Sequence, residues 1–363
     1  MPERTNGERL PRLRRSDPSA PGLRRAGERG RFVYLGLDGA PLCDPGELNR
    51  INSLGIPPAW QRVWIASDPL GHLQATGVDN AGRTQYIYHE LWKRQRDRAK
   101  YAHMEAFARA LPSMRREVVA TLRTGTELDR ETVLACALRL LDVGLFRIGS
   151  EVYEKEDGHL GLATLKKENV TVGAGEVVFA YVGKSGVRHV QPVSDPPAVT
   201  IVSALARRHD GGEHLLAYRA ADAWHQVHAE QINGRLKRLV GDQFSAKNFR
   251  TWNGTVVAAA ALAGRGRHAT TQAARLRAIS AAALTVSQVL GNTPAVARRS
   301  YIDPRVFDRY LSGWTVAPDC EPTVVHSGAD DPQREHLESA VLDLLHDNRR
   351  SVAIEHFPEL RAP

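Results

Sequence analysis

TQYIYHELWKRQRDRAKYAHMEAFARAL, residues 84–111, decides the fold, because the hydrophobic period of the chain changes within it. Its first six residues alternate between outward and inward positions, which is typical of a half-buried strand. From Leu91 onward the apolar residues follow a helical period. We therefore expect a β-containing part before this stretch and a mainly helical part after it.

The part before the stretch predicts a small antiparallel sheet. Short alternating runs are separated by turn-forming segments rich in Gly, Pro, Asp and Asn. The runs are RFVYLG (31–36), RVWIAS (62–67) and HLQATGV (72–78), and the turns are LDGAP (37–41), SDPLG (67–71) and DNAGR (79–83). PGELNRINSLGI, residues 45–56, predicts one short helix. Residues 29–95 are thus expected to form an α+β lobe, and residues 1–28, rich in Arg, Pro, Gly and Ser, a flexible basic tail.

The part after the stretch predicts a larger, mainly α-helical domain over residues 96–315. One β interruption, EVVFAYVGKSGVRHVQPV at 176–193, predicts a hairpin that turns at Gly183–Gly186. Residues 316–363 are expected to be a C-terminal tail. The predicted helices are DRETVLACALRLL (129–141), ADAWHQVHAEQINGRLKRL (221–239), the alanine-rich stretch after Ser245, TQAARLRAISAAALTVSQVL (271–290), two short helices begun by Thr293-Pro294 and Asp303-Pro304, and REHLESAVLDLL (334–345) in the tail.

Composition narrows the class of protein. The chain has 363 residues, 42% of them hydrophobic, with a net charge of +8 and a pI near 9.6, which fits a polyanionic partner. It contains no run of eighteen apolar residues, and its first segment lacks the apolar centre of a secretion signal, so we expect a soluble intracellular protein. The three cysteines, Cys43, Cys136 and Cys320, form no CxxC pair, so neither a disulfide framework nor a metal site is expected.

Four residues on different predicted elements carry reactive or cationic groups: Arg147, Lys184, Arg250 and Tyr301. Transfer of a phosphodiester to a side chain needs a nucleophile, an acid for the leaving oxygen, and fixed positive charge around the non-bridging oxygens. The set contains each of these groups.

Six blocks, in order, resemble segments of one enzyme family. LFRIGSE (145–151), YVGKSGVRH (181–189), KNFRTWNGT (247–255) and LGNTPAVARRSYIDP (290–304) resemble the active-site blocks of type IB DNA topoisomerases. IPPAWQRVWI (56–65) and GHLQATGVDNAGRTQYIYH (71–89) resemble the amino-terminal lobe of the bacterial and poxvirus-like branch. The likeness runs from about Asp17 to Gly313.

The resemblance implies a role for each of the four residues. Tyr301 would attack phosphorus to form a 3′-phosphotyrosyl link, and Lys184, from the minor groove, would protonate the leaving 5′ oxygen. Arg147 and Arg250 would grip the non-bridging oxygens as planar forks. Other readings stay open: Arg147 as a surface arginine paired with Glu151, and Lys184 as a solvated turn lysine. Arg250 lies in a helix that Ser245 is expected to cap.

One position departs from the family pattern. Many members carry histidine where this chain has Asn292, whose amide can donate a hydrogen bond to phosphate but cannot carry charge or a proton. It could instead cap a helix at the Gly291 break. In the amino-terminal lobe, the resemblance implies major-groove DNA contacts in a block that could equally be an ordinary sheet face: Arg83, Gln85, Tyr86 and Tyr88.

The expected function is relaxation of positive and negative supercoils in duplex DNA, through single-strand cleavage and religation without ATP, metal or another cofactor. The resemblance further implies a monomer that closes around DNA as a clamp, in a cytoplasmic, nucleoid-associated setting. A site-specific tyrosine recombinase is the main alternative, but Lys247 stands where that class has the histidine of its HxxR motif. A basic DNA-binding protein without catalysis would explain the charge and leave the active-site blocks unexplained.

Overall fold

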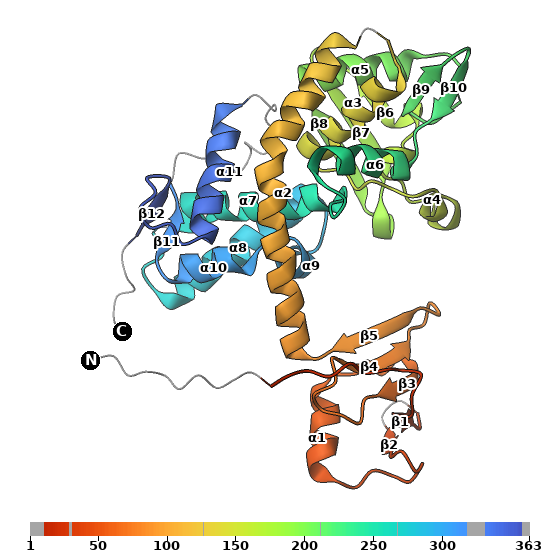
Figure 1. Ribbon diagram of the computed structural model, residues 1–363, viewed down its shortest axis with the longest axis vertical. Helices are drawn as coiled ribbons and strands as arrows, with labels where there is room; N and C mark the ends of the chain where they lie inside the picture. The colour runs from red at the N-terminus through yellow and green to blue at the C-terminus, as the bar shows by residue number, and fades with distance from the viewer. Residues whose placement is uncertain are drawn as a thin grey trace. The chain divides into compact units, whose positions relative to one another are not determined.

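The protein is described here from a computed structural model that covers residues 11–28, 31–125, 127–210, 212–266, 268–317 and 331–357. It divides into two compact units, residues 1–102 and 103–363 (Figure 1). The long helix α2, Glu90–Thr124, begins in the first unit and ends in the second. No described helix is both long and apolar enough to span a membrane.

The first unit is a five-stranded antiparallel sheet with one helix. The strands follow the order β2-β1-β3-β4-β5. Their bounds are Leu23–Ala26 (β1), Val33–Leu35 (β2), Gln61–Ile65 (β3), Leu73–Val78 (β4) and Thr84–Tyr88 (β5). Helix α1, Pro45–Ser53, begins at Asp44, whose carboxylate accepts from the Glu47 backbone N–H. The α+β lobe expected from the sequence is confirmed.

The core of this unit includes residues that were expected to lie in a flexible tail. Leu23 of β1 is buried with Ile51, Val63, Ile65 and Ala75. Residues 23–26 therefore belong to the sheet, and the expectation of a flexible tail over residues 1–28 is wrong for them. LRRA carries no alternating apolar pattern from which a strand could be predicted. One buried leucine and the ladder bonds to two neighbouring strands hold it in the sheet. Residues 1–10 lie outside the described residues.

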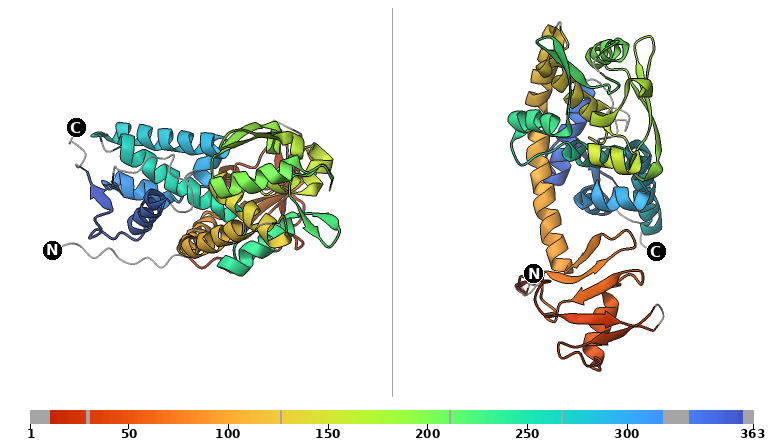
Figure 2. Two further views of the ribbon diagram at one scale, coloured as in Figure 1. Left: turned by 90° about the horizontal axis from the view of Figure 1, so that it is seen from above. Right: turned by 90° about the vertical axis from the view of Figure 1, so that its right-hand side faces the viewer.

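The second unit is mainly helical. Helices α7 and α8 run side by side (Figure 2). The helices after α2 are Arg130–Val143 (α3), Glu151–Asp157 (α4), Pro196–Arg207 (α5), Ala229–Val240 (α6), Lys247–Gly266 (α7), Gln272–Leu290 (α8), Pro294–Ser300 (α9), Pro304–Leu311 (α10) and Pro332–Leu345 (α11), with short 3-10 turns at Leu162–Thr164 (η1), Lys167–Asn169 (η2) and Lys184–Gly186 (η3).

Three small antiparallel sheets complete the second unit. The predicted hairpin of residues 176–193 is confirmed as two strands of one of them. The sheets are Val170–Val172 (β6) with Val177–Val182 (β7) and Arg188–Val193 (β8), Ala217–Ala220 (β9) with Ala223–Gln226 (β10), and Trp314–Val316 (β11) with Ile354–His356 (β12).

The helix predicted over residues 221–239 is half wrong. It starts only at Ala229, because Ala223–Gln226 pairs with β9 around a two-residue turn at Ala221 and Asp222. The ring of Trp224 lies under the Arg208 guanidinium, 5.3 Å from it, and His225 stacks on Tyr218. These contacts override the helical propensity of the local sequence.

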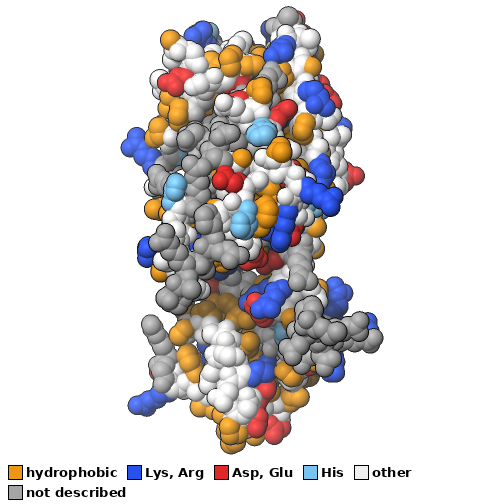
Figure 3. All heavy atoms as spheres, turned by 90° about the vertical axis from the view of Figure 1, so that its left-hand side faces the viewer, with side chains coloured by type: hydrophobic (Ala, Val, Ile, Leu, Met, Phe, Trp, Pro, Cys, Tyr) orange, Lys and Arg blue, Asp and Glu red, His pale blue; other side chains and the backbone are white. Residues whose placement is uncertain are grey.

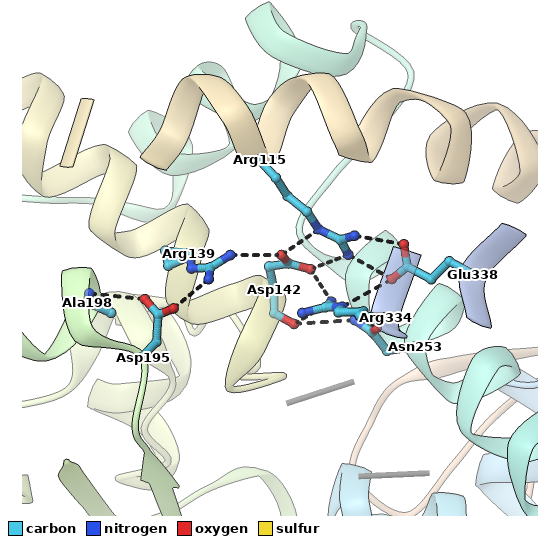
Figure 4. Close-up of polar contacts among 8 residues, drawn as sticks. All are labelled: Arg115, Arg139, Asp142, Asp195, Ala198, Asn253, Arg334 and Glu338. Carbon is cyan, nitrogen blue, oxygen red and sulfur yellow. Dashed lines mark hydrogen bonds and ion pairs between the residues drawn. The ribbon is translucent and has the colours of Figure 1, made fainter. Parts of the chain in front are cut away.

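The predicted C-terminal tail is also corrected. Although residues 318–330 and 358–363 lie outside the described part, α11 packs on α7 and α10, and β12 pairs with β11. A buried ionic cluster holds α11 in place (Figure 4). Arg115 of α2 contacts Asp142 of α3 at 2.8 Å and Glu338 of α11 at 2.7 Å, and Arg334 contacts Asp142 at 2.6 Å.

Candidate active site

Arg147 lies in a non-helical loop between α3 and α4. The loop begins at Gly144, the C-cap of α3. Further along, a Cβ on Gly149 would lie 2.9 Å from the Gly161 Cα, so both segments need glycine to approach each other. The Arg147 guanidinium donates a hydrogen bond to Asn292 Oδ1. The alternative pairing of Arg147 with Glu151 does not form, since Glu151 contacts His228 instead.

Arg250 is a buried arginine of α7, only 4% exposed. Its two terminal nitrogens donate to the backbone carbonyls of Leu145, at 2.5 Å, and Leu290, at 2.6 Å. These bonds tie the Arg147 loop and the end of α8 to one guanidinium. The expected Ser245 cap is not formed, because its hydroxyl contacts the Asn248 side chain rather than a backbone N–H.

Tyr301 is held close to α7. It is the C-cap of α9, and its N–H donates to the Ala297 carbonyl at 3.0 Å. A Cβ on Gly254 would lie 2.7 Å from the Tyr301 carbonyl oxygen, so glycine at this position of α7 permits the approach. The Arg250 guanidinium carbon lies 5.3 Å from the centroid of the phenol ring. The side chain is thus fixed against α7 and 7% exposed.

Two tyrosines share the two arginines but respond oppositely. Burial raises the pKa of Tyr301, but Arg250 and Arg147, through charge and hydrogen bonds, outweigh burial and bring it below its ordinary value. Burial also raises the pKa of Tyr181, to about 12, against a weaker influence of the same arginines. The Tyr181 hydroxyl donates to Gln191 Oε1 at 2.7 Å. Tyr301 is therefore the phenol that ionises more readily.

Burial and a neighbouring positive charge also shift the pKa of Arg250. Burial, followed by the neighbouring Arg147, lowers the pKa of Arg250 to about 10, although Tyr301 acts in the opposite direction. The side chain remains a cation at neutral pH. An entering anion would relieve the repulsion between the two guanidiniums.

A cavity of about 1200 Å³ brings the remaining predicted residues together. Arg147, Lys184, Asn292 and Tyr301 all line it. Lys184 is exposed and reaches the cavity from the tip of the β7–β8 hairpin, where Ser185 has a positive φ of 67°. Arg250 lies behind Tyr301, in contact with its ring. All five predicted catalytic residues therefore meet at one site.

Three buried donors of this site have no acceptor among the described residues. They are Nε of Arg147, Nε of Arg250 and Nδ2 of Asn292. Buried polar groups are almost always hydrogen-bonded, and an unpaired one costs about 1–3 kcal/mol. Donors of this kind around one cavity suit an anion with several oxygens, such as a phosphodiester.

The sequence interpretation missed His189 and Gln191, which also line the cavity. His189 stacks on Tyr181 across the hairpin, with ring centroids 5.1 Å apart. Gln191 donates to the Gly144 carbonyl at 2.6 Å. Pairing the predicted hairpin around its turn would have placed Tyr181 opposite His189, so the register was the available signal.

The four predicted DNA-contacting residues lie in the first unit, on or beside the edge strand β5. Tyr86 and Tyr88 share one face of β5, with ring centroids 6.1 Å apart, while Ile87 between them packs on the core. Arg83 and Gln85 both contact Asp79, at 2.9 Å each. Hydrogen bonds, chiefly from Arg83, lower the pKa of Asp79 to about 2.

The surface charge alone does not locate a binding path. On the face drawn in Figure 3, Lys and Arg side chains are interspersed with acidic and apolar ones rather than gathered in one patch. Among the residues with described positions, no three His, Cys, Asp or Glu side chains are grouped as a metal ion would require. The cavity lined by Tyr301 is where the structure groups Arg147, Lys184 and Asn292.

Comparisons with known proteins agree with this geometry. Residues 89–311 match the family described as the eukaryotic DNA topoisomerase I catalytic core, and residues 31–79 match the N-terminal domain of bacterial DNA topoisomerase IB. DNA topoisomerase 1B of Acanthamoeba polyphaga mimivirus is 26% identical over 288 residues, which is 77% of this chain and 85% of that protein. DNA topoisomerase 1B of vaccinia virus is 28% identical over 133 residues, covering 36% of this chain and 40% of that protein.

Proposed function

The chain belongs to the type IB DNA topoisomerases and relaxes supercoiled DNA, and from that premise we propose that it does so through a transient covalent bond between Tyr301 and a 3′ phosphate. The matches include both the core and the N-terminal domain, so the recombinase and non-catalytic alternatives are set aside. The described residues supply every group that the chemistry needs from one chain, which supports action as a monomer around duplex DNA.

In the proposed cleavage step the Tyr301 oxygen attacks phosphorus and its proton passes to solvent. The P–O bond to tyrosine forms while the P–O5′ bond breaks, and Lys184 delivers a proton to the departing 5′ oxygen. Arg147, Arg250 and Asn292 donate to the non-bridging oxygens as negative charge builds on them. Religation reverses each transfer. The ester keeps the bond energy, so the cycle requires no nucleotide.

A single observation carries this assignment. Among the described residues, two buried donors without a partner belong to Arg147 and Asn292, which line the cavity with Tyr301, and a third belongs to Arg250, behind the phenol. Arg250 and Arg147 also lower the pKa of that phenol. An oxyanion site and an activated nucleophile thus share one place. Tyr181 lies near the same arginines, but burial raises its pKa and its hydroxyl donates to Gln191, which supports Tyr301 as the nucleophile.

The test is relaxation of plasmid DNA of either sign in EDTA without nucleotide, followed by mass spectrometry of the adduct on suicide-substrate DNA. We expect a nucleotide attached to Tyr301 through its 3′ end. Tyr301→Phe should bind DNA and form no adduct, while Tyr181→Phe should still form one. An adduct on another residue, or relaxation by Tyr301→Phe, would overturn the assignment.

A further inference from the structure

His189 occupies an unusual place between two segments of the active site. It lies on β8 and its imidazole stacks on Tyr181 of β7, with the ring planes 16° apart. The ring is half-buried and lines the same cavity as Tyr301. No step of the proposed reaction uses it.

Two glycines make room for the two edges of this imidazole. A Cβ on Gly183 would lie 2.8 Å from Cδ2 of His189 and 2.9 Å from Nε2. A Cβ on Gly291 would lie 2.3 Å from Cε1 and 3.0 Å from Nδ1. At each glycine the shortest of these distances is below 3.0 Å, which real Cβ atoms essentially never show, so the ring rests directly on both glycines. One glycine precedes Lys184 and the other precedes Asn292.

Hydrogen bonds hold the hairpin that carries Lys184 both at its base and near its tip. Near its base, Gln191 donates to the Gly144 carbonyl at 2.6 Å and accepts from the Tyr181 hydroxyl at 2.7 Å. Nearer the tip, the Gly186 N–H donates to His159 Nε2 at 3.1 Å, and the Val182 carbonyl accepts from the Leu160 N–H at 2.9 Å. The imidazole adds a contact from this hairpin to Gly291, which precedes Asn292.

We propose that His189 is a positioning residue, whose ring sets the separation between the Lys184 hairpin and the Asn292 segment. Lys184, the proton donor, and Asn292, the oxyanion donor, then both contact the same phosphodiester. This inference rests on the proposed function of both residues. Burial, followed by Arg147 and Arg250, lowers the pKa of His189, which favours the neutral ring.

The experiment separates placement of the acid from other defects. Single-turnover cleavage is compared on ordinary suicide DNA and on DNA with sulfur as the 5′-bridging atom, whose thiolate leaves without a proton. We expect His189→Ala to slow ordinary cleavage by about ten- to a hundredfold, since a misplacement near 1 Å has such effects. Sulfur should restore the rate, as it should for Lys184→Ala and should not for Arg147→Ala.

His225→Ala is the matched control. His225 also stacks on a tyrosine across a hairpin, with Tyr218 at 5.4 Å, but lies outside the residues that line the cavity. The His225→Ala variant should cleave both substrates at the wild-type rate. Normal cleavage by His189→Ala, or slow cleavage that sulfur does not restore, would overturn the inference. Absence of any adduct on the wild-type enzyme would instead defeat the proposed function itself.

A second set of variants tests the contact without relying on one substitution. Gly183→Ala should slow cleavage, because its Cβ overlaps the ring. Combining it with His189→Ala removes the overlap, so the double variant should cleave no more slowly than His189→Ala alone. Independent, multiplying losses would contradict the contact. His189→Phe retains a ring without a basic nitrogen, and a rate as low as that of His189→Ala would assign proton transfer to the imidazole instead.

Discussion

Replacing Glu338 of α11 by Gln should destabilise the second unit strongly while barely changing its shape. The cluster in Figure 4 holds three cations, Arg115, Arg139 and Arg334, against three anions, Asp142, Asp195 and Glu338. The side chains are nearly inaccessible to water, with exposures from 1% to 7%. The substitution leaves one uncompensated positive charge among them.

The magnitude follows from this imbalance. Breaking a buried ion pair by removing one partner costs about 3–5 kcal/mol, because the remaining charge stays desolvated. For a unit of this size each kcal/mol lowers Tm by about 2–4 °C, so the expected loss is on the order of 10 °C. Glu338 contacts Arg115 at 2.7 Å and Arg334 at 3.2 Å, so both guanidiniums lose one of their two anionic partners and share Asp142 alone.

Urea and thermal unfolding followed by circular dichroism would measure the loss. Glu335→Gln is the matched control, because this carboxylate lies on the same helix and is exposed, and it should change stability by less than about 0.5 kcal/mol. Arg334→Leu combined with Glu338→Leu keeps the cluster neutral and should be more stable than Glu338→Gln alone. Wild-type stability of Glu338→Gln would refute the idea of a dry, balanced cluster.

Three further predictions concern charge. Burial raises the pKa of Asp142, but the surrounding arginines lower it by more, so the carboxylate stabilises the fold above its unfolded pKa of about 3.9. This stabilisation is lost as the pH falls below that value, and acid titration should therefore show unfolding below about pH 4. The rate of cleavage should rise with pH, with a midpoint below about 10, the ordinary pKa of a phenol. Arg250→Gln should move the midpoint of its residual activity upward, and an unmoved midpoint would contradict the role of Arg250. DNA binding should weaken steeply with salt, and a flat response in a titration of affinity against salt would argue against many phosphate contacts.

Much of the fold could be predicted where one local pattern decides the structure. The change of period at Leu91, the caps at Thr293 and Asp303, and the turn around Lys184 each lie within a few residues of sequence. Strand β1 was missed because ladder bonds to the distant strand β3 help to hold it, and such bonds leave no hydrophobic alternation. Strand β10 pairs with the neighbouring β9 across a two-residue turn, and it was missed because its residues continue the helical pattern of the segment that follows.

Only the site residues whose side chains carry charged or reactive groups could be predicted from the sequence. Guanidinium, ammonium and phenol groups identify themselves by type, whereas His189 acquires its importance from two glycines far apart in the chain. The C-terminal helix poses the same difficulty. Arg334 and Glu338 at helical spacing read as an ordinary exposed pair, and only the fold buries them against Asp142 and Arg115.

Asn292 shows how a neutral residue fits a site that already holds two cations. Arg147 donates to its Oδ1, which fixes the amide so that Nδ2 remains as the unpaired donor. A cationic side chain here would add a third positive charge beside Arg250, whose pKa is already lowered to about 10. In the proposed cleavage step the amide would donate a directed hydrogen bond without that repulsion.

Two substitutions of Asn292 remove the same donor but should differ in rate. Asn292→Ala should slow cleavage by about a hundredfold, as loss of one oxyanion donor does elsewhere. Asn292→Asp should be slower still, because its carboxylate retains the Arg147 contact but neutralises that guanidinium and repels the phosphate. Single-turnover cleavage on suicide DNA measures both rates. If the aspartate variant equals or exceeds the alanine variant, Asn292 serves the helix break at Gly291 and not the phosphate.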